Sequence, residues 1–242
     1  MTTALITGGG SGIGQALAWQ LAGKGFNVII IGRTASRLEA TQQKFPDQIK
    51  IIKADISQPQ DRQNIVDALQ QAIDLQYVIH NAALVKPFSP VQKLGLDQWR
   101  QAMAVNVEAP IFLTQSLVPM MKAGRVLHIS TGLAHRAFAG MAAYCISKAA
   151  LHMAYLVCQQ DYADSAIKFG SVMPGTVDTP MQQDLRSAGQ QDLPVQAFFK
   201  ALKTDDKLLS PAMVAHRIAK FLLETDDSTF TEKDWRIEQL LD

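Results

Sequence analysis

Residues 4–24 read ALITGGGSGIGQALAWQLAGK, and this stretch gives the strongest indication of the fold. A short apolar run ends at Thr7, a turn rich in glycine follows to Gly14, and a pattern with helical periodicity then continues to Lys24. Glycine lets the backbone turn tightly and lets a ligand approach it closely. The start of the helix adds free N–H groups and the positive end of the helix dipole, which together favour a phosphate.

We therefore expect this turn to bind the pyrophosphate of a dinucleotide. The residues predicted to contact it are Gly8, Ser11, Gly12, Ile13 and Gly14. The strict Gly-x-Gly-x-x-Gly fingerprint is not met, because counting from Gly12 it needs a glycine where the chain has Leu17. A plain strand-to-helix turn is the alternative interpretation.

The rest of the chain alternates between strand-like and helical segments. Short, apolar, β-branched runs predict strands at 4–7, 27–31, 49–53, 77–80, 125–130 and 168–173. Helical patterns predict helices at 14–24, 36–44, 60–73, 97–121 and 141–162. This alternation predicts an α/β fold of the Rossmann type, with a doubly wound, mostly parallel sheet flanked by helices. We expect residues 1–242 to form a single domain whose ligands bind at the carboxyl ends of the strands.

Composition excludes several classes of function. The chain has 242 residues, of which 48% are hydrophobic and 19% charged, and its net charge is +1. No basic run indicates nucleic acid, and no apolar stretch is long enough to span a membrane. No signal peptide is recognisable, so a cytoplasmic location is expected. Cys145 and Cys158 lie too far apart along one predicted helix for a disulfide, and no residue spacing predicts a metal site.

Polar residues at the ends of the next strands predict the rest of the cofactor site. Arg33 follows the second strand, where a carboxylate would favour NAD and a basic side chain favours the 2′-phosphate of NADP. The chain has no carboxylate there, so NADP(H) is the expected cofactor. Asp55, Asn81 and Ala82 follow the third and fourth strands, where adenine and ribose would lie. Asp55 is alternatively a helix cap, and Asn81 a turn former.

Tyr144 and Lys148 are the candidate catalytic pair. Residues four apart share one face of a helix, so we expect the ammonium to lie near the phenol and to lower its pKa. Thr131 follows the fifth strand, and Asn106 lies in the apolar middle of a predicted helix, where asparagine needs hydrogen bonds. A loop after the sixth strand is expected to cover a nicotinamide. Its predicted contact residues are Pro174, Gly175, Val177 and Thr179.

Two segments, residues 181–206 and the loop between Thr131 and Tyr144, are expected to border a substrate. Residues 181–206 predict a helical lid, in which Phe198 and Phe199 form an apolar pair. His135 lies on the loop between Thr131 and Tyr144, but a role as general base is not favoured. Asp234 is interpreted as a solvated charge.

Together these motifs resemble the short-chain dehydrogenase/reductase family. The resemblance rests on the Thr-Gly-x-x-x-Gly-x-Gly turn, Asn-Ala after the fourth strand, the mid-helix asparagine, Tyr-x-x-x-Lys and Pro-Gly after the sixth strand. It implies that Tyr144 donates a proton to a carbonyl oxygen while hydride arrives from the nicotinamide. Lys148 would hold the nicotinamide ribose and lower the tyrosine's pKa, and Asn106 would hold a water behind Lys148.

The chain departs from the family pattern at three places. Thr131 stands where the family has its catalytic serine, and Ala83 where it usually has glycine. The C-terminus lacks the Asp-Gly-Gly strand that supports tetramers. The ending resembles the sepiapterin reductase and benzil reductase branch, which implies an NADPH-dependent reductase of a small ketone or vicinal diketone. A homodimer packed through the helices at 97–121 and 141–162 is expected.

Two other functions remain open from the sequence. One is an NADP(H)-binding regulatory or interaction protein on a reductase fold, which the departures at Thr131 and Ala83 keep possible. The other is an NADP-linked alcohol dehydrogenase working in the oxidative direction, because the same residues catalyse both directions.

Overall fold

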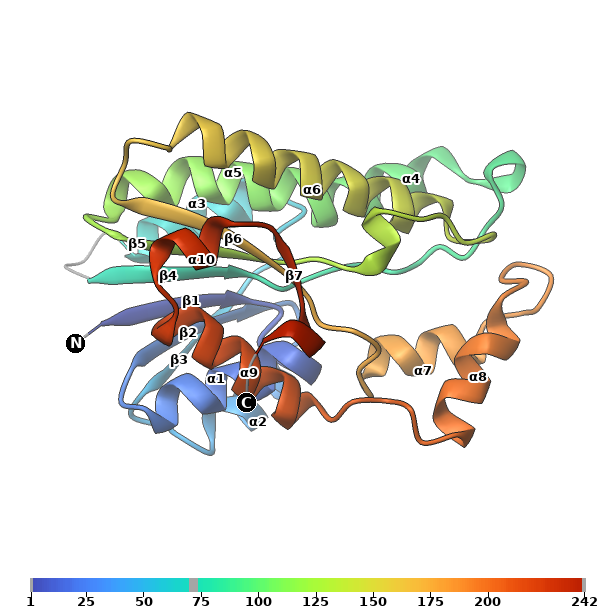
Figure 1. The fold of residues 1–242 in the computed structure, drawn as a ribbon, viewed down its shortest axis with the longest axis horizontal. Helices are drawn as coiled ribbons and strands as arrows, with labels where there is room; N and C mark the ends of the chain where they lie inside the picture. The colour runs from blue at the N-terminus through green and yellow to red at the C-terminus, as the bar shows by residue number, and fades with distance from the viewer. Residues whose placement is uncertain (1, 70–73, 241–242) are drawn as a thin grey trace.

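The computed structural model describes residues 2–69 and 74–240, which build one parallel sheet with helices on both faces (Figure 1). The order of the described strands is β3-β2-β1-β4-β5-β6-β7. They are β1 (Thr3–Thr7), β2 (Asn27–Gly32), β3 (Ile49–Lys53), β4 (Leu75–His80), β5 (Gly124–Ile129), β6 (Ile167–Met173) and β7 (Asp234–Arg236). The chain moves from β3 back past β1 to β4, so a topological switch point lies between β1 and β4.

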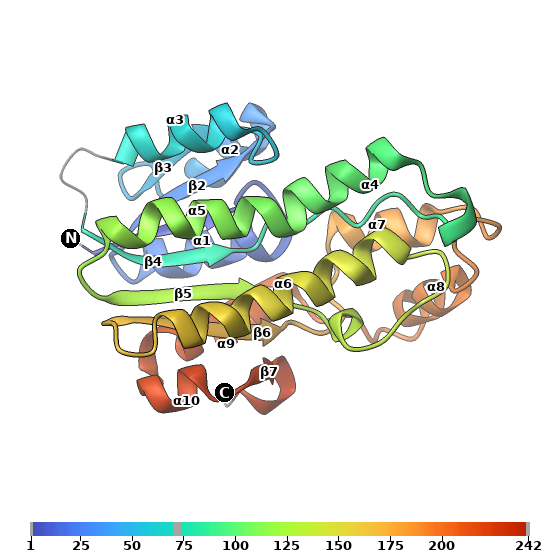
Figure 2. The same cartoon turned by 90° about the horizontal axis from the view of Figure 1, so that it is seen from above.

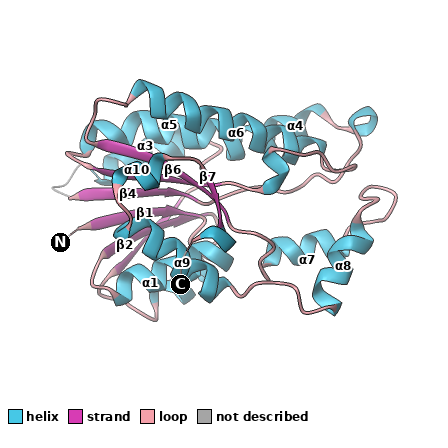
Figure 3. Cartoon of the chain, in the orientation of Figure 1, coloured by secondary structure: helices cyan, strands magenta, loops and turns pink. Residues whose placement is uncertain are grey.

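Helices cover both faces of the sheet. They are α1 (Gly12–Gly23), α2 (Ala35–Gln42), α3 (Pro59–Leu69), α4 (Leu96–Met103), α5 (Ala109–Leu117), α6 (Ala142–Asp161), α7 (Pro180–Ser187), α8 (Gln196–Thr204), α9 (Pro211–Glu224) and α10 (Asp227–Thr231). In Figure 1, α1, α2 and α9 lie below the sheet, whereas α3, α5 and α6 lie above it. Figure 3 shows α7 and α8 set apart from both layers, beyond the ends of the strands.

Buried aliphatic side chains hold each layer to the sheet. Leu17 and Leu21 of α1 are fully buried and belong to one core cluster with Ile218 of α9. On the opposite face, Leu113 of α5 and Tyr155 of α6 are fully buried in a second cluster. Burying one such side chain stabilises the fold by roughly 1.5–3 kcal/mol. The strand ends are therefore held rigidly where the candidate site residues begin.

The six predicted strands are confirmed, and the seventh strand was not predicted. β7 has three residues, and it pairs with β6 through Ser171 and Asp234, Val172 and Trp235, and Met173 and Arg236. A strand is thus present near the C-terminus even though the Asp-Gly-Gly sequence is not. Its three residues, Asp-Trp-Arg, are too few to predict a strand by pattern, and it is recognised by its pairing with β6.

The long helix predicted at 97–121 is interrupted. α4 and α5 are joined by a π-helical segment, Ala104–Glu108, and a short 3₁₀ turn follows α5 at Val118–Met120. The helix predicted at 60–73 is observed as α3, and residues 70–73 of that prediction lie outside the described residues. Within the described parts of the chain, no helix is both long and apolar enough to cross a membrane.

Candidate active site

The glycine-rich turn lies at the switch point, between the carboxyl ends of β1 and β4. The N–H groups of Gly8 and Gly9 both donate to the carbonyl oxygen of Ile31, at 2.8 and 3.2 Å. Gly8 has a positive φ of 72°, and a Cβ there would lie 2.9 Å from Cα of Ala82. A side chain at this position would be both strained and obstructed, so the turn requires glycine.

Asn81 supports this turn from β4. Its Nδ2 donates to the carbonyl oxygens of Thr7 and Gly8, at 2.9 and 3.3 Å. The hydroxyl of Thr7 in turn accepts the backbone N–H groups of Asn81 and Ala82. The amide of Asn81 is therefore committed to the backbone of the turn, which corresponds to the turn-forming interpretation, although the residue also lines the cavity.

One cavity of about 920 Å³ joins this turn to the candidate catalytic residues. Its cofactor end is lined by Gly8, Ser11, Gly12, Ile13, Arg33, Asp55, Asn81 and Ala82. Asp55 accepts hydrogen bonds from the N–H and hydroxyl of Ser57, at 3.0 and 2.8 Å, just before α3 begins. These bonds close a turn before α3 begins at Pro59, so they do not support the helix-cap interpretation, and Asp55 also lines the cavity. Pro174, Gly175, Val177 and Thr179 line the cavity after β6, as predicted.

Tyr144 and Lys148 lie one turn apart on α6, and both side chains are buried at the edge of the cavity. Nζ of Lys148 donates to the carbonyl oxygen of Ile129 at 2.8 Å, at the end of β5. Thr131 lines the same cavity, and its hydroxyl lies near enough to the phenol of Tyr144 to lower the pKa of that phenol. Its neighbour Ser130 donates instead to Asp234 at 2.9 Å. This is the alternation expected of adjacent strand residues.

The predicted effect of Lys148 on Tyr144 is wrong for this structure. Burial raises the pKa of Tyr144 to about 12, and the nearby hydroxyl of Thr131 opposes that rise. Burial also lowers the pKa of Lys148 to about 8, while the Asp234 carboxylate opposes that fall. The cause is loss of solvent, which disfavours the charged form of both groups. Spacing on a helix predicted which residues meet but not how deeply they are buried.

Asn106 lies in the π-helical segment and is fully buried. Its Oδ1 accepts the N–H of Leu84 at 2.7 Å, and its Nδ2 donates to the carbonyl oxygen of Leu84 and to the hydroxyl of Ser147, both at 2.9 Å. Ser147 precedes Lys148, so Asn106 ties the loop after β4 to the catalytic face of α6. π-helical insertions are frequent at functional sites.

We predict that Asn106→Ala lowers the free energy of unfolding by about 2–4 kcal/mol, because the N–H and carbonyl of Leu84 and the fully buried hydroxyl of Ser147 all lose their bonds to the amide. Urea denaturation measures the change. Asn64→Ala is the matched control, because Asn64 is exposed on α3. Equal stability of the Asn106 variant and the wild type would contradict the anchoring role.

The comparisons with known proteins agree with this geometry. The model of the family described as short chain dehydrogenase matches residues 2–190. The chain belongs to this family. A 30% identical relative, an uncharacterized oxidoreductase of Schizosaccharomyces pombe, aligns over 92% of this chain and 91% of its own length. The benzil reductase ((S)-benzoin forming) of Bacillus cereus is 29% identical, over 94% of this chain and 96% of its own length.

Solved structures of short-chain dehydrogenases share the fold. One from Saccharomyces cerevisiae superposes with a TM-score of 0.91 at 23% identity, covering 99% of this chain and 97% of that one. A metagenomic short-chain oxidoreductase in complex with NADP gives a TM-score of 0.77 at 21% identity, covering 97% and 96% of the two chains. In this chain the cavity lies at the carboxyl edge of the sheet.

The positions of Arg37 and Asp234 in this dehydrogenase were not predicted from the sequence. Arg37 of α2 lines the cofactor end together with Arg33, and its Cβ lies where a side chain on Gly10 would contact it. The sequence signal that could have predicted Arg37 is its basic side chain, four positions after Arg33. The interpretation of Asp234 as a solvated charge is wrong, because its side chain is only 6% exposed. Its burial depends on Ser130 and Ser171, which are distant in sequence.

The substrate end of the cavity is largely apolar. Phe138 packs edge-on against Phe198 and Phe199, with ring centroids 5.9 and 6.2 Å apart. Phe199 is buried and Phe198 is 44% exposed, and both residues of the predicted apolar pair line the cavity. An exposed ion pair of 2.8 Å between Lys86 and Asp184 joins the loop after β4 to α7 across this end.

Proposed function

We propose that the protein is an NADPH-dependent carbonyl reductase acting on a small, partly apolar ketone or vicinal diketone. The observation that carries this proposal is the single cavity, with basic residues and the glycine turn at one end and Thr131, Tyr144 and Lys148 at the other. Initial rates of NADPH oxidation with vicinal diketones test it. Turnover supports the assignment, and its absence across diketones and aromatic ketones contradicts it.

The chain's own residues fit NADP(H). The N–H groups at the start of α1 are not used by a side-chain cap at Ser11, which suits a pyrophosphate. Arg33 and Arg37 line the cavity near Thr34 at the start of α2, where they would pair with a 2′-phosphate. Lys148, with Pro174, Gly175, Val177 and Thr179, would hold the nicotinamide ribose and carboxamide. When bound, NADPH supplies the hydride.

Tyr144 is the proposed proton donor. Thr131 lines the same cavity as Tyr144 and would orient the carbonyl oxygen of the substrate between the two hydroxyl groups. A pKa raised by burial to about 12 keeps Tyr144 protonated across the physiological range, so the proton it would donate is present. Asn106 would hold the water that resupplies protons behind Lys148.

The aromatic lining supports an apolar substrate. Phe138, Phe198 and Phe199 offer ring faces and edges to a flat, apolar group beside the reacting carbonyl. The similarity to a benzil reductase points to the same class of substrate. We propose that residues 181–206, which contain α7 and α8, act as the lid over this end.

We predict that Arg33→Ala raises the KM for NADPH by about 10- to 100-fold, since one lost charge-assisted hydrogen bond costs roughly 1.5–3 kcal/mol. The KM for NADH should stay nearly unchanged, because NADH lacks the 2′-phosphate. Initial rates with NADPH and with NADH measure the change in each KM. Arg100→Ala, at an exposed position on α4, is the control. A parallel rise in both KM values would contradict 2′-phosphate recognition by Arg33.

A homodimer is also proposed, through the face that α5 and α6 present in Figure 2. Phe112 of α5 and Ile146, Met153 and Val157 of α6 are 44–58% exposed, although all are large and apolar. Sedimentation equilibrium should give twice the chain mass, and Met153→Glu should shift it toward the monomer. A monomeric wild type would contradict this proposal.

We place the protein in the cytoplasm, where the free thiols of Cys145 and Cys158 stay reduced.

A further inference from the structure

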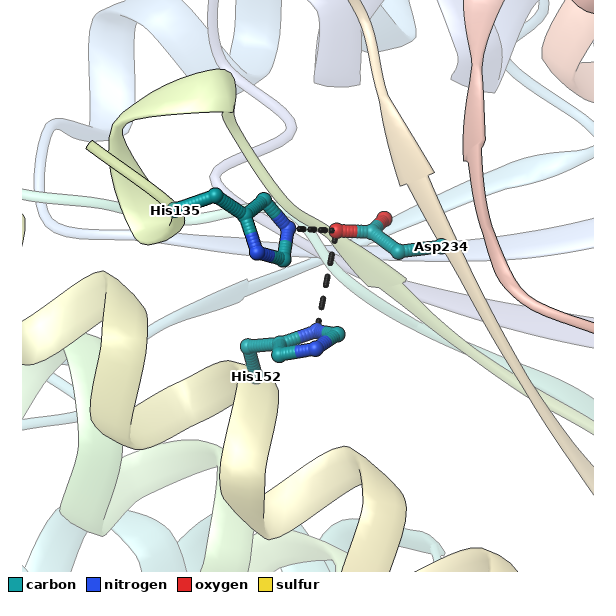
Figure 4. Close-up of side chains that lie close together, drawn as sticks. All are labelled: His135, His152 and Asp234. Carbon is teal, nitrogen blue, oxygen red and sulfur yellow. Dashed lines mark hydrogen bonds and ion pairs between the residues drawn. The ribbon is translucent and has the colours of Figure 1, made fainter.

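Three titratable side chains lie close together, as Figure 4 shows, and one of them, His135, also lines the cavity. His135 comes from the loop after β5, His152 from α6, and Asp234 from β7. Nε2 of His135 lies 3.0 Å from Oδ2 of Asp234, and Nδ1 of His152 lies 3.6 Å from the same oxygen. The three possible ligand atoms all lie within 4.8 Å of one another.

These separations suit a small four-coordinate ion. Zinc binds imidazole nitrogen and carboxylate oxygen at about 2.0–2.2 Å, so neighbouring ligand atoms of a tetrahedral site are about 3.3 Å apart. The two measured distances to Oδ2 lie on either side of that value. His135 is the ligand that can move to complete the geometry, because its side chain is 44% exposed on a loop.

The surroundings of Asp234 resemble the outer shell of a metal ligand. Ser130 donates to Oδ2 and Ser171 donates to Oδ1, each at 2.9 Å, so both carboxylate oxygens are oriented. Hydrogen-bonded partners of this kind commonly hold ligating carboxylates in place. Nδ1 of His152 is buried and has no hydrogen-bond partner among the described residues, which leaves its lone pair available.

We propose that His135, His152 and Asp234 form a binding site for a zinc-class divalent cation. Two imidazoles and one carboxylate favour zinc over magnesium or calcium, which prefer oxygen ligands. Water, or a polar group in the cavity that His135 lines, would take the fourth position. The ion would join the loop bordering the substrate to α6, which carries Tyr144 and Lys148.

Cobalt is the most direct probe, because a tetrahedral Co²⁺ site absorbs visible light strongly. The full chain, treated with chelator and dialysed, should bind one Co²⁺ per chain, and Zn²⁺ should displace it. We expect His135→Ala and His152→Ala each to weaken binding by about 100-fold or more, and Ser171→Ala by about 10-fold, since losing an outer-shell partner typically costs roughly 10–100-fold. Asp234→Asn should also abolish the cobalt spectrum.

Two comparisons keep this test decisive if Asp234→Asn fails to fold. His135→Ala leaves the bonds of both serines to Asp234 in place, so it should keep the wild-type circular dichroism while losing the ion. His216→Ala, at an exposed position on α9, should bind as the wild type does. The proposal is overturned if neither ion binds. It is equally overturned if binding is unchanged in both the His135 and His152 variants, which would mean an adventitious ion only.

Discussion

Tyr144→Phe is expected to lower kcat for carbonyl reduction by about 10²- to 10⁴-fold, the usual contribution of a positioned general acid. The substitution removes one hydroxyl and keeps the buried ring, so the packing of α6 should be preserved. The Kd for NADPH should hardly change, because the lost group acts on the substrate oxygen. Steady-state kinetics together with fluorescence titration of NADPH separate the two effects.

Tyr155→Phe on the same helix is the matched control for this experiment. Tyr155 is fully buried, and its hydroxyl has no hydrogen-bond partner among the described residues. Losing that hydroxyl should leave kcat unchanged and the fold intact. Wild-type turnover in Tyr144→Phe would assign proton donation to another group and refute the proposed mechanism.

Lys148→Met should lower kcat/KM for NADPH by about 100-fold, which corresponds to roughly 3 kcal/mol. Methionine keeps most of the unbranched stem but removes the ammonium, which is buried at the cavity edge and donates to Ile129. Initial rates at varied NADPH concentration measure the change. Lys93→Met, at an exposed position, should behave as the wild type.

Deprotonation of the same lysine should reduce the activity of the wild-type enzyme at high pH. Burial lowers the pKa of Lys148 from 10.5 to about 8, so the ammonium is lost as the pH rises through that value. We expect kcat/KM for NADPH, which reports groups of the free enzyme, to fall above about pH 8. The pH profile of Lys148→Met should lack this fall in kcat/KM. A wild-type profile flat to pH 10 would contradict the assignment.

Stability should change in the opposite direction over this range. Between about pH 8 and 10.5, Lys148 is protonated in the unfolded chain but not in the folded one. The unfolded state then binds more protons, so the contribution of Lys148 to the free energy of unfolding increases with pH. The fall in activity is therefore not expected to reflect unfolding caused by Lys148.

The features predicted well from the sequence depend on local patterns. The turn from Thr7 to Gly14 needs particular residues at each backbone position, and Tyr144 and Lys148 meet because four residues make about one helical turn. Buried parallel strands likewise show as continuous apolar runs, which is why β1 to β6 were predicted.

The features that were missed depend on partners distant in sequence. β7 is a strand only because β6 pairs with it, and Asp234 is buried only because Ser130 and Ser171 bond it. The pKa of Tyr144 was predicted in the wrong direction for a similar reason. A spacing indicates which charge is near, whereas the loss of water depends on the assembled loops and helices around the phenol.

The central claim is that this chain transfers hydride from NADPH to a ketone, with Tyr144 supplying the proton. The most direct test is the initial rate of NADPH oxidation, compared with NADH, across vicinal diketones, aromatic ketones and sepiapterin. We expect turnover with NADPH preferred and a vicinal diketone among the best substrates. Tight NADPH binding with no oxidation on any carbonyl compound would contradict it, and would favour a cofactor-binding regulatory protein instead.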